Sequence, residues 1–389
     1  MAYVIFVVLW SVSVFIVFWA MVGYPVFLCI LDKIKKPPQI QKDYSFMPTT
    51  TVLVVAHNEE KVILEKLNNI INIDYPRDKL SIMVTSDCST DRTNEIVERF
   101  ILDHKQFDIR LHKTIKHGGK TNAQNEAVKL IKSDLIVMTD ANCMFDKNAV
   151  KEIAACFKNP KIKYVCGATV YTNSKNNRTA DSENRYWDID SKCRDIESRV
   201  QTITAGDGNL YACRADDYKE IPLIECHDSS FPVLFALEGG KAVFDSMAVT
   251  YEKAGENDKD EYKRKVRMNR NIIHNILPSI SILNIFKCKW FTVFWLSHRT
   301  CRYLLWIAHL CLLIISGVLF KMSFFWKLVF LGQCVFYIIS IMGIVFKSNN
   351  RVIKLMSYYT MTIMAQWHGV YNIITGKSKP TWAKAESTR

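Results

Sequence analysis

The sequence lacks the marks of several common protein classes. Its twelve cysteines form no C-x-x-C pair, so no zinc finger is predicted. It has neither an RNP-like aromatic motif nor a long basic tract, so nucleic acid is not expected as a partner. A chain of this size does not need disulfides to stabilise its fold, and we expect the thiols to be reduced and mostly buried.

The chain does carry an excess of positive charge. The formal net charge is +13 over 389 residues, and the isoelectric point is near 9.1. This balance favours anionic partners, which here means phosphorylated ligands or acidic lipid. The length allows one large soluble domain with a sizeable core, together with membrane segments.

The main pattern in the sequence is a short apolar run that ends in a carboxylate. Residues 133–142 read S-D-L-I-V-M-T-D-A-N, so the run leads without interruption into Asp140. A run without polar alternation is typical of a strand that is buried on both faces. We therefore expect Asp140 at the carboxyl end of a buried strand.

The same pattern occurs twice upstream. Thr51–Val55 leads to Glu59, and Leu80–Thr85 leads to Asp87. If these strands are parallel to the strand before Asp140, all three carboxylates reach one edge of the sheet. Ligands bind at that edge in open α/β sheets.

The stretches between the apolar runs support parallel strands. Lys61–Ile73 and Arg92–Leu102 have apolar residues at helical spacing, and a strand-to-strand separation of about thirty residues suits a βαβ crossover. Ile109–His112 predicts a further strand and Lys120–Lys132 a further helix. The fold class is therefore α/β with a mostly parallel sheet. A purely structural α/β domain explains any one acidic loop residue more easily than it explains all three.

The amino-terminal segment predicts a membrane helix. Ala2–Leu31 is almost purely apolar, lacks a basic residue before it, and is followed by the basic cluster Asp32–Lys36. It is too long for the core of a signal peptide, so we expect a transmembrane helix. By the positive-inside rule, the basic cluster places the following domain on the cytoplasmic side.

The carboxyl-terminal third also has membrane character. Ile272–Phe286 and Trp290–His298 are aromatic and partly polar, which favours helices in the membrane interface. Tyr303–Phe320 and Phe324–Phe346 are apolar enough to span, whereas Ile353–Thr375 is more polar and could span, lie in the interface or re-enter. We therefore expect a transmembrane helix at residues 1–32, a soluble domain at 48–270, interfacial helices at 271–302, a transmembrane region at 303–376 and a basic tail at 377–389.

Two short motifs point to phosphate and metal. Residues 117–121 read H-G-G-K-T, but Thr114 stands where a P-loop needs its first glycine, so that interpretation fails. Two glycines and Lys120 at a helix start still suit a pyrophosphate, although a flexible loop with a solvated lysine explains the motif equally well. Asp140 and Asn142 lie on one side of an extended tripeptide and could hold a divalent ion, although such a pair is more often a simple turn.

Taken in order, these segments resemble the family 2 inverting glycosyltransferases with a GT-A fold, in particular the processive polysaccharide synthases of membranes. The resemblance extends over nearly the whole chain. Residues 56–60, A-H-N-E-E, are similar to the opening motif of the family, which implies nucleotide contacts from Ala56, Asn58 and Glu59. Residues 86–91, S-D-C-S-T-D, are similar to its D-x-S-x-D motif, which implies that Asp87 contacts uracil or ribose.

The phosphate and metal motifs match the family in part. Gly119 and Lys120 are similar to its G-K helix start, although the next residues differ. Asp140 and Asn142 stand at its D-x-D motif, which implies that they hold Mg²⁺ or Mn²⁺. Asparagine replaces the second acid here, and an amide oxygen is a weaker ligand than a carboxylate.

Residues 206–214 resemble the acceptor-side segment of the family, which implies acceptor contacts from Gly206, Asp207 and Gly208. His227 and Asp228 align with its catalytic pair of acids. Asp228 falls on the general base, whereas His227 replaces the first acid.

Residues 262–267 are similar to the Q-x-x-R-W region of the family. Arg264 replaces the glutamine and Met268 the tryptophan, and the resemblance implies that Arg264 and Arg267 bind the nucleotide diphosphate. A membrane-facing cationic helix is the alternative interpretation of this segment.

The resemblance implies transfer of a sugar from a nucleoside-diphosphate sugar, with UDP as the expected carrier, to a growing polysaccharide or a lipid-linked glycan. An inverting transfer needs a base on the acceptor hydroxyl and charge stabilisation on the leaving diphosphate. Asp228 would supply the first role, and Asp140, Asn142, Lys120 and Arg267 the second. The expected location is the cell membrane, with membrane lipid as a further partner.

A receptor that binds a nucleotide sugar at the membrane without turning it over is the alternative function. The two departures from the family pattern, Asn142 and His227, favour it. The presence of Asp228, Lys120 and Arg267 argues against it, because a decayed enzyme has no reason to keep its base.

Overall fold

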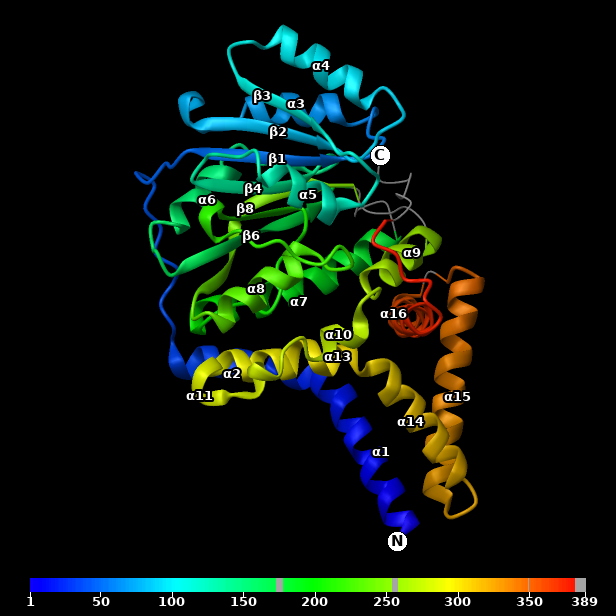
Figure 1. Ribbon diagram of the computed structural model, residues 1–389. Coiled ribbons are helices and arrows are strands. Elements are labelled where there is room, and N and C mark those ends of the chain that lie inside the picture. Colours follow the sequence, from blue (N-terminus) through cyan, green and yellow to red (C-terminus); the bar gives the residue numbers. More distant parts are fainter. Residues whose placement is uncertain (173–177, 254–257, 349, 382–389) are drawn as a thin grey trace.

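A computed structural model of the chain describes residues 1–172, 178–253, 258–348 and 350–381. A twisted sheet with helices on both faces forms the upper part of the molecule, and long helices extend below it (Figure 1). The eight strands lie in the order β3-β2-β1-β4-β7-β6-β8-β5. Their bounds are β1 Thr50–Ala56, β2 Leu80–Ser86, β3 Asp108–Lys113, β4 Leu135–Asp140, β5 Met144–Phe145, β6 Ile162–Tyr171, β7 Leu210–Arg214 and β8 Lys241–Glu252.

The predicted parallel strands are confirmed. β1 pairs in parallel with both β2 and β4, and β2 pairs in parallel with β3. β7 lies between β4 and β6 and is antiparallel to both, while β6 and β8 are parallel. Because β1, β2 and β4 run in one direction, their carboxyl ends meet at one edge.

The helices of the sheet domain follow the predicted crossovers. α3 spans Ile63–Ile71 and α4 spans Thr93–Asp103, close to the predicted ranges. α5 spans Lys120–Val128 and ends four residues before the predicted Lys132, because Leu130 and Ile131 form tighter turns onto Ala127 and Val128. The remaining helices of this domain are α6 Ala149–Cys156, α7 Arg178–Val200, α8 His227–Leu237 and α9 Asp258–Met268.

The two faces of the sheet bury separate hydrophobic clusters. Val52 and Val54 of β1 pack on one face, and Leu53 between them packs on the other. This alternation follows from strand geometry, in which successive side chains point to opposite faces. Each fully buried aliphatic side chain stabilises the fold by about 1.5–3 kcal/mol, so the central strands hold the sheet edge in a fixed position.

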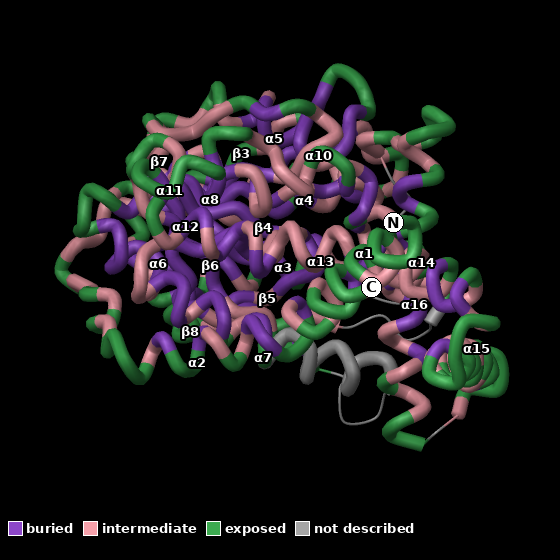
Figure 2. The backbone as a smooth tube through the Cα atoms, turned by 90° about the horizontal axis from the view of Figure 1, so that it is seen from below, coloured by how far each residue is buried: buried purple, intermediate pink, exposed green. Residues whose placement is uncertain are grey.

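Two helices are long and apolar enough to cross a membrane. Ala2–Lys35 combines α1 Ala2–Phe18, the π-helical turn η1 Trp19–Gly23 and α2 Tyr24–Lys35, and α15 Phe324–Val345 is the second. α14 Leu305–Val318 is shorter than predicted, and it reaches spanning length only with Trp290–Tyr303, from which it bends by 57°. Figure 2 shows exposed residues along much of α15 and buried residues through the sheet.

The predicted interfacial segment Ile272–Phe286 is not one helix. It divides into α10 Ile272–Ile276, a 3₁₀ turn at Ile280–Leu283 and α11 Ile285–Cys288. Pro278 explains the break, since proline lacks the amide proton and disfavours helix in the residue before it. The next segment is helical, as α12 Trp290–Phe294, the π-helical η6 Trp295–Thr300 and α13 Cys301–Tyr303.

α16 Arg351–Ile374 crosses the direction of α15. Figure 1 shows α16 end-on, whereas α1, α14 and α15 are seen side-on. Over the described residues, α16 is not among the helices that are long and apolar enough to cross a membrane. The position of Ile353–Thr375 relative to a membrane stays a prediction.

A buried polar network joins the amino-terminal helix to the sheet domain. Tyr24 of α2 donates to Glu197 of α7 at 2.5 Å, and His298 of η6 lies 2.6 Å from Glu197 and 3.0 Å from Asp190. Arg302 Nη1 lies 2.6 Å from Asp190. Glu197 is fully buried. The network therefore fixes the amino-terminal helix to the sheet domain.

Candidate active site

The sequence places three carboxylates at the edge formed by β1, β2 and β4, and the structure brings their strands together there. Ala56 ends β1, and its carbonyl accepts a hydrogen bond from the Asp87 amide at 2.8 Å. Asn58 Oδ1 accepts from the Thr90 amide at 2.7 Å, and Glu59 is buried. Ala56 and Asn58 thus connect the loop after β1 to the loop after β2.

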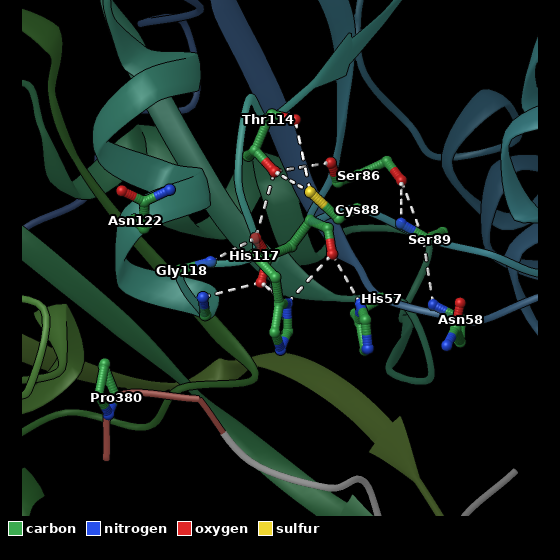
Figure 3. A network of polar contacts seen from close by, with 12 residues as sticks. His57, Asn58, Ser86, Cys88, Ser89, Thr114, His117, Gly118, Asn122 and Pro380 are labelled. Atoms are coloured by element: carbon green, nitrogen blue, oxygen red, sulfur yellow. Dashed lines mark hydrogen bonds and ion pairs between the residues drawn. The ribbon is translucent and has the colours of Figure 1, made fainter.

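Asp87 holds the glycine turn before α5 (Figure 3). Its Oδ1 and Oδ2 accept from the amides of Gly118 and Gly119 at 3.0 and 2.8 Å. His117 Nδ1 lies 2.9 Å from Oδ2, and Thr114 Oγ1 donates to Oδ1 at 3.2 Å. Gly119 has φ +84°, a conformation that favours glycine. Asp87 therefore shapes the turn that aims the α5 amides, a role that the sequence did not indicate.

Two histidines stack beside Asp87. The rings of His57 and His117 lie 4.4 Å apart and nearly parallel, and His57 Nδ1 lies 2.6 Å from the Asp87 carbonyl. With Asp87, they lie close enough to hold a metal ion. The amides of Gly118 and Gly119 and the Thr114 hydroxyl donate to the same carboxylate, so Asp87 also has partners outside this group.

Four groups converge at Gly208. Lys120 Nζ donates to the Gly208 carbonyl at 3.0 Å and forms an ion pair with Asp140. A methyl group built on Gly208 would lie 3.6 Å from the Asp228 carboxyl carbon and 3.6 Å from Lys120 Nζ. Residues from the metal, phosphate, acceptor and base motifs therefore meet at one point, although they come from four separate segments.

Asp228 lies in the first turn of α8. Its backbone carbonyl accepts from the Gly206 amide at 2.7 Å, which ties α8 to the predicted acceptor segment. Burial raises the pKa of Asp228 above its usual value, the charge of Lys120 opposes this rise, and the charge of Asp207 adds to it. A raised pKa makes the carboxylate a stronger base.

The His227 side chain points into the interior of the domain and not toward the proposed reaction site. It is 1% exposed and lies 2.7 Å from the Tyr218 hydroxyl, 2.9 Å from Gln124 Oε1 and 3.1 Å from Asn125 Oδ1. Burial lowers the pKa of His227 to about 3. The residue that replaces the first acid is therefore a neutral hydrogen-bonding group between α5 and α8.

Asn142 contacts a carboxylate that was not among the predicted site residues. Its Nδ2 donates to Glu252 Oε1 at 2.9 Å, and Asn209 Nδ2 donates to Glu252 Oε2 at 2.6 Å. Burial raises the pKa of Glu252 to about 7; the charge of Arg264 opposes the rise, and that of Asp140 adds to it. The signal in the sequence was the same as for Asp140, an acid at the end of a strand.

The predicted diphosphate arginines lie on α9. Burial lowers the pKa of Arg267 to about 10, the charge of Arg264 adds to the fall, and that of Asp140 opposes it. Arg264 pairs with Glu261 at 2.8 Å. The charge of Asp140 acts on Arg267, so α9 brings cationic charge to the same site.

Arg270 is a further residue near the site that the motifs did not predict. Its guanidinium donates to the carbonyls of Ile224 and Glu225 at 2.7 and 2.9 Å, just before α8, and to the Pro380 carbonyl at 2.9 Å. A methyl group on Gly119 would lie 2.8 Å from the same carbonyl. The start of the predicted basic tail therefore lies beside the glycine turn, and residues 382–389 of that tail lie outside the described residues.

The donor chemistry around Asp140 fits the metal that the resemblance implies. Asp140 offers a carboxylate and Asn142 follows it on the same loop beside Glu252, and Mg²⁺ and Mn²⁺ prefer oxygen ligands.

The comparisons with known proteins agree with this geometry. Residues 51–218 match the model of glycosyl transferase family 2. The probable glycosyltransferase YdaM of Bacillus subtilis is 32% identical over 139 residues, which are 34% of this chain and 33% of that protein. The beta-monoglucosyldiacylglycerol synthase of Nostoc sp. is 26% identical over 143 residues, 36% of this chain and 31% of that protein. The match thus spans about a third of each relative.

A solved structure shows the fold. The mannosyltransferase PcManGT from Pyrobaculum calidifontis, in complex with GDP-Man and Mn²⁺, superposes with a TM-score of 0.72 at 18% identity. The superposition covers 95% of this chain and 99% of that one, so the likeness includes the helices outside the sheet. Residues 51–218 therefore form a glycosyl transferase family 2 domain, and the fold around it is the GT-A fold of the mannosyltransferase structure.

Proposed function

We propose that this chain is an inverting glycosyltransferase that moves a sugar from a nucleoside-diphosphate sugar, with UDP as the expected carrier, to a growing polysaccharide or lipid-linked glycan at a membrane. The convergence of Lys120, Asp140 and Asp228 at Gly208 supports it most directly. A cation for the leaving diphosphate and a base for the acceptor then both lie beside Gly208. Both are needed for transfer with inversion.

In this mechanism Asp228 accepts the proton of the acceptor hydroxyl. Gly206, Asp207 and Gly208 form the loop against which the acceptor lies. Lys120 and Arg267 balance the charge of the departing diphosphate, and Arg264 supports them. A divalent ion held by Asp140 would supply further charge neutralisation there. The nucleoside lies toward Ala56, Asn58, Glu59 and Asp87.

The proposed transfer takes place at the cytoplasmic surface of a membrane. Residues 48–270 form the catalytic domain, which the lysines at the end of Ala2–Lys35 keep on the cytoplasmic side of the cell membrane. Residues 271–302 lie in the interface, where the acceptor glycan or its lipid carrier arrives. The two departures that favoured a receptor are both compatible with catalysis, because His227 bonds to Gln124 in the interior and Asn142 binds Glu252.

Incubation of purified membranes with a panel of radiolabelled UDP- and GDP-sugars, followed by sizing of the product, tests this function. A polymer or a labelled lipid from one donor supports it and identifies the acceptor class. Binding of a nucleotide sugar without any transfer would favour the receptor.

Asp87→Ala should weaken UDP binding by about 1.5–3 kcal/mol, the scale for losing a hydrogen bond to a charged group. Titration calorimetry of the solubilised protein measures this. Asp108→Ala, which removes a surface carboxylate paired with Arg110 on β3, is the matched control. Since Asp87 also holds the glycine turn, the melting temperature of each variant is needed. Unchanged UDP affinity in the Asp87 variant would remove this residue from the nucleotide site.

Transfer should require Mg²⁺ or Mn²⁺, and the ion should bind weakly in the absence of nucleotide because the diphosphate oxygens complete its ligands. Excess EDTA should therefore abolish transfer, and added Mn²⁺ should restore it. Full transfer in EDTA would contradict the metal assignment.

A further inference from the structure

We propose that Glu252 supplies the metal-site carboxylate that position 142 lacks, so that Asp140 and Glu252 together hold the divalent ion. The inference rests on the proposed function and deepens it. Asn142 then has a different role from the one its place in the sequence implies. It positions Glu252 through its amide nitrogen.

The orientation of Asn142 is the first observation. An ionised carboxylate only accepts hydrogen bonds, so the amide atom that faces Glu252 at 2.9 Å must be the nitrogen. The amide oxygen lies 3.8 Å from Cys143 Sγ. The Asn142 amide nitrogen thus serves as a hydrogen-bond donor to Glu252.

The support of Glu252 is the second observation. Its two oxygens accept from two different amides, those of Asn142 and Asn209. Each carboxylate oxygen keeps a second lone pair after one such bond. Neutral donors can orient a carboxylate without cancelling its charge, as the outer groups of metal sites do.

Backbone pairing fixes Glu252 beside the loop after Asp140. β5 and β8 are antiparallel with Met144 opposite Tyr251, so Glu252 lies next to the Asn142–Cys143 pair. On its other side, the Thr172 amide donates to the Glu252 carbonyl at 3.0 Å. A residue at the end of a doubly paired strand is held more rigidly than one on a loop.

The alternative is that Glu252 only balances the charge of Arg264. Arg264 already pairs with Glu261 through two hydrogen bonds of 2.8 and 3.0 Å. Glu252 instead has amide donors on both oxygens, and it lies beside the loop that follows Asp140. Two carboxylates held near each other are a common arrangement for a divalent cation.

Binding of Mn²⁺ to the solubilised full chain, with saturating UDP, tests the inference by the electron paramagnetic resonance of the free ion. Glu252→Gln should weaken Mn²⁺ binding by at least about tenfold, since even outer groups of metal sites contribute that much. UDP affinity in EDTA should stay close to that of the unsubstituted chain. Glu126→Gln is the matched control, because Glu126 also accepts from an asparagine amide, at 2.7 Å, on α5.

The double variant Asn142→Asp with Glu252→Gln exchanges the amide and the carboxylate at constant charge. It should recover Mn²⁺ binding to within about threefold, because a carboxylate again stands beside Asp140. Native Mn²⁺ affinity in Glu252→Gln, or no recovery in a folded double variant, overturns the inference. If the unsubstituted chain itself binds neither UDP nor Mn²⁺, the proposed function fails instead.

Discussion

Asp228→Asn is expected to lower the turnover number for sugar transfer by about 10²–10⁴ while nucleotide-sugar binding stays nearly intact. Asparagine keeps the size and the hydrogen-bonding reach of the side chain, but it cannot take the proton of the acceptor hydroxyl. The carboxylate lies beside Gly208 and Lys120, where the acceptor and donor motifs meet. Steady-state transfer rates and UDP-sugar affinity, measured on one preparation, check the result.

A purely structural Asp228 makes a different prediction. Asp228 lies in the first turn of α8, whose N-cap is Cys226, and an acid there stabilises the helix through its dipole by about 0.3–1 kcal/mol. Asp217→Asn, at a partly buried aspartate paired with Lys163, controls for the loss of a carboxylate outside the site. An Asp228 variant that melts early yet transfers at the normal rate would move the base elsewhere, with Asp207 and Glu225 as the next candidates.

Glu197→Ala should lower the free energy of unfolding by about 3–5 kcal/mol, the cost of removing one partner from a buried ion pair. Glu197 accepts from Tyr24 and lies 2.6 Å from His298, and none of its surface is exposed. The change leaves the buried side chains of His298 and Tyr24 without that partner. Thermal unfolding in detergent, followed by intrinsic fluorescence, gives the shift.

Glu60→Ala is the control for this change. Glu60 pairs with Arg92 at 3.4 Å, and the Arg92 side chain is 75% exposed. Exposed pairs of this kind contribute at most about 1 kcal/mol, because solvent screens them. Equal losses of stability in the two variants would show that the Glu197 network does not hold the joint together.

The sequence predicted most of the sheet domain because its signals are local. Apolar runs of five or six residues indicated β1, β2 and β4, and acids after those runs marked the edge where the site lies. The place of β7 between β4 and β6 was not predictable in this way, since the pairing of distant strands leaves no periodic mark. Pro278, which breaks the segment after α10, is a local signal for that break.

The candidate site likewise contains residues that the sequence could identify and residues that it could not. Asp87, Lys120 and Asp228 each belong to a short motif, so the sequence could identify them. Glu252 stands 110 residues from Asn142, and nothing near it in the chain indicates the contact. Lys66 is a further case, because a lysine on an amphipathic helix is expected at the surface. It is fully buried instead, with Nζ donating to Thr139 at 3.2 Å behind Asp140.

The network around Glu197 also sets an order for making the protein. Tyr24 is synthesised 173 residues before Glu197, and His298 follows another 101 residues later. At about 5–20 residues per second, α2 exists for roughly 10–35 s before its partner on α7 is made. His298 is synthesised about 5–20 s after that. All strands of the sheet have been synthesised by then, so the contact between the amino-terminal helix and the sheet domain forms late, around a domain whose strands are already complete.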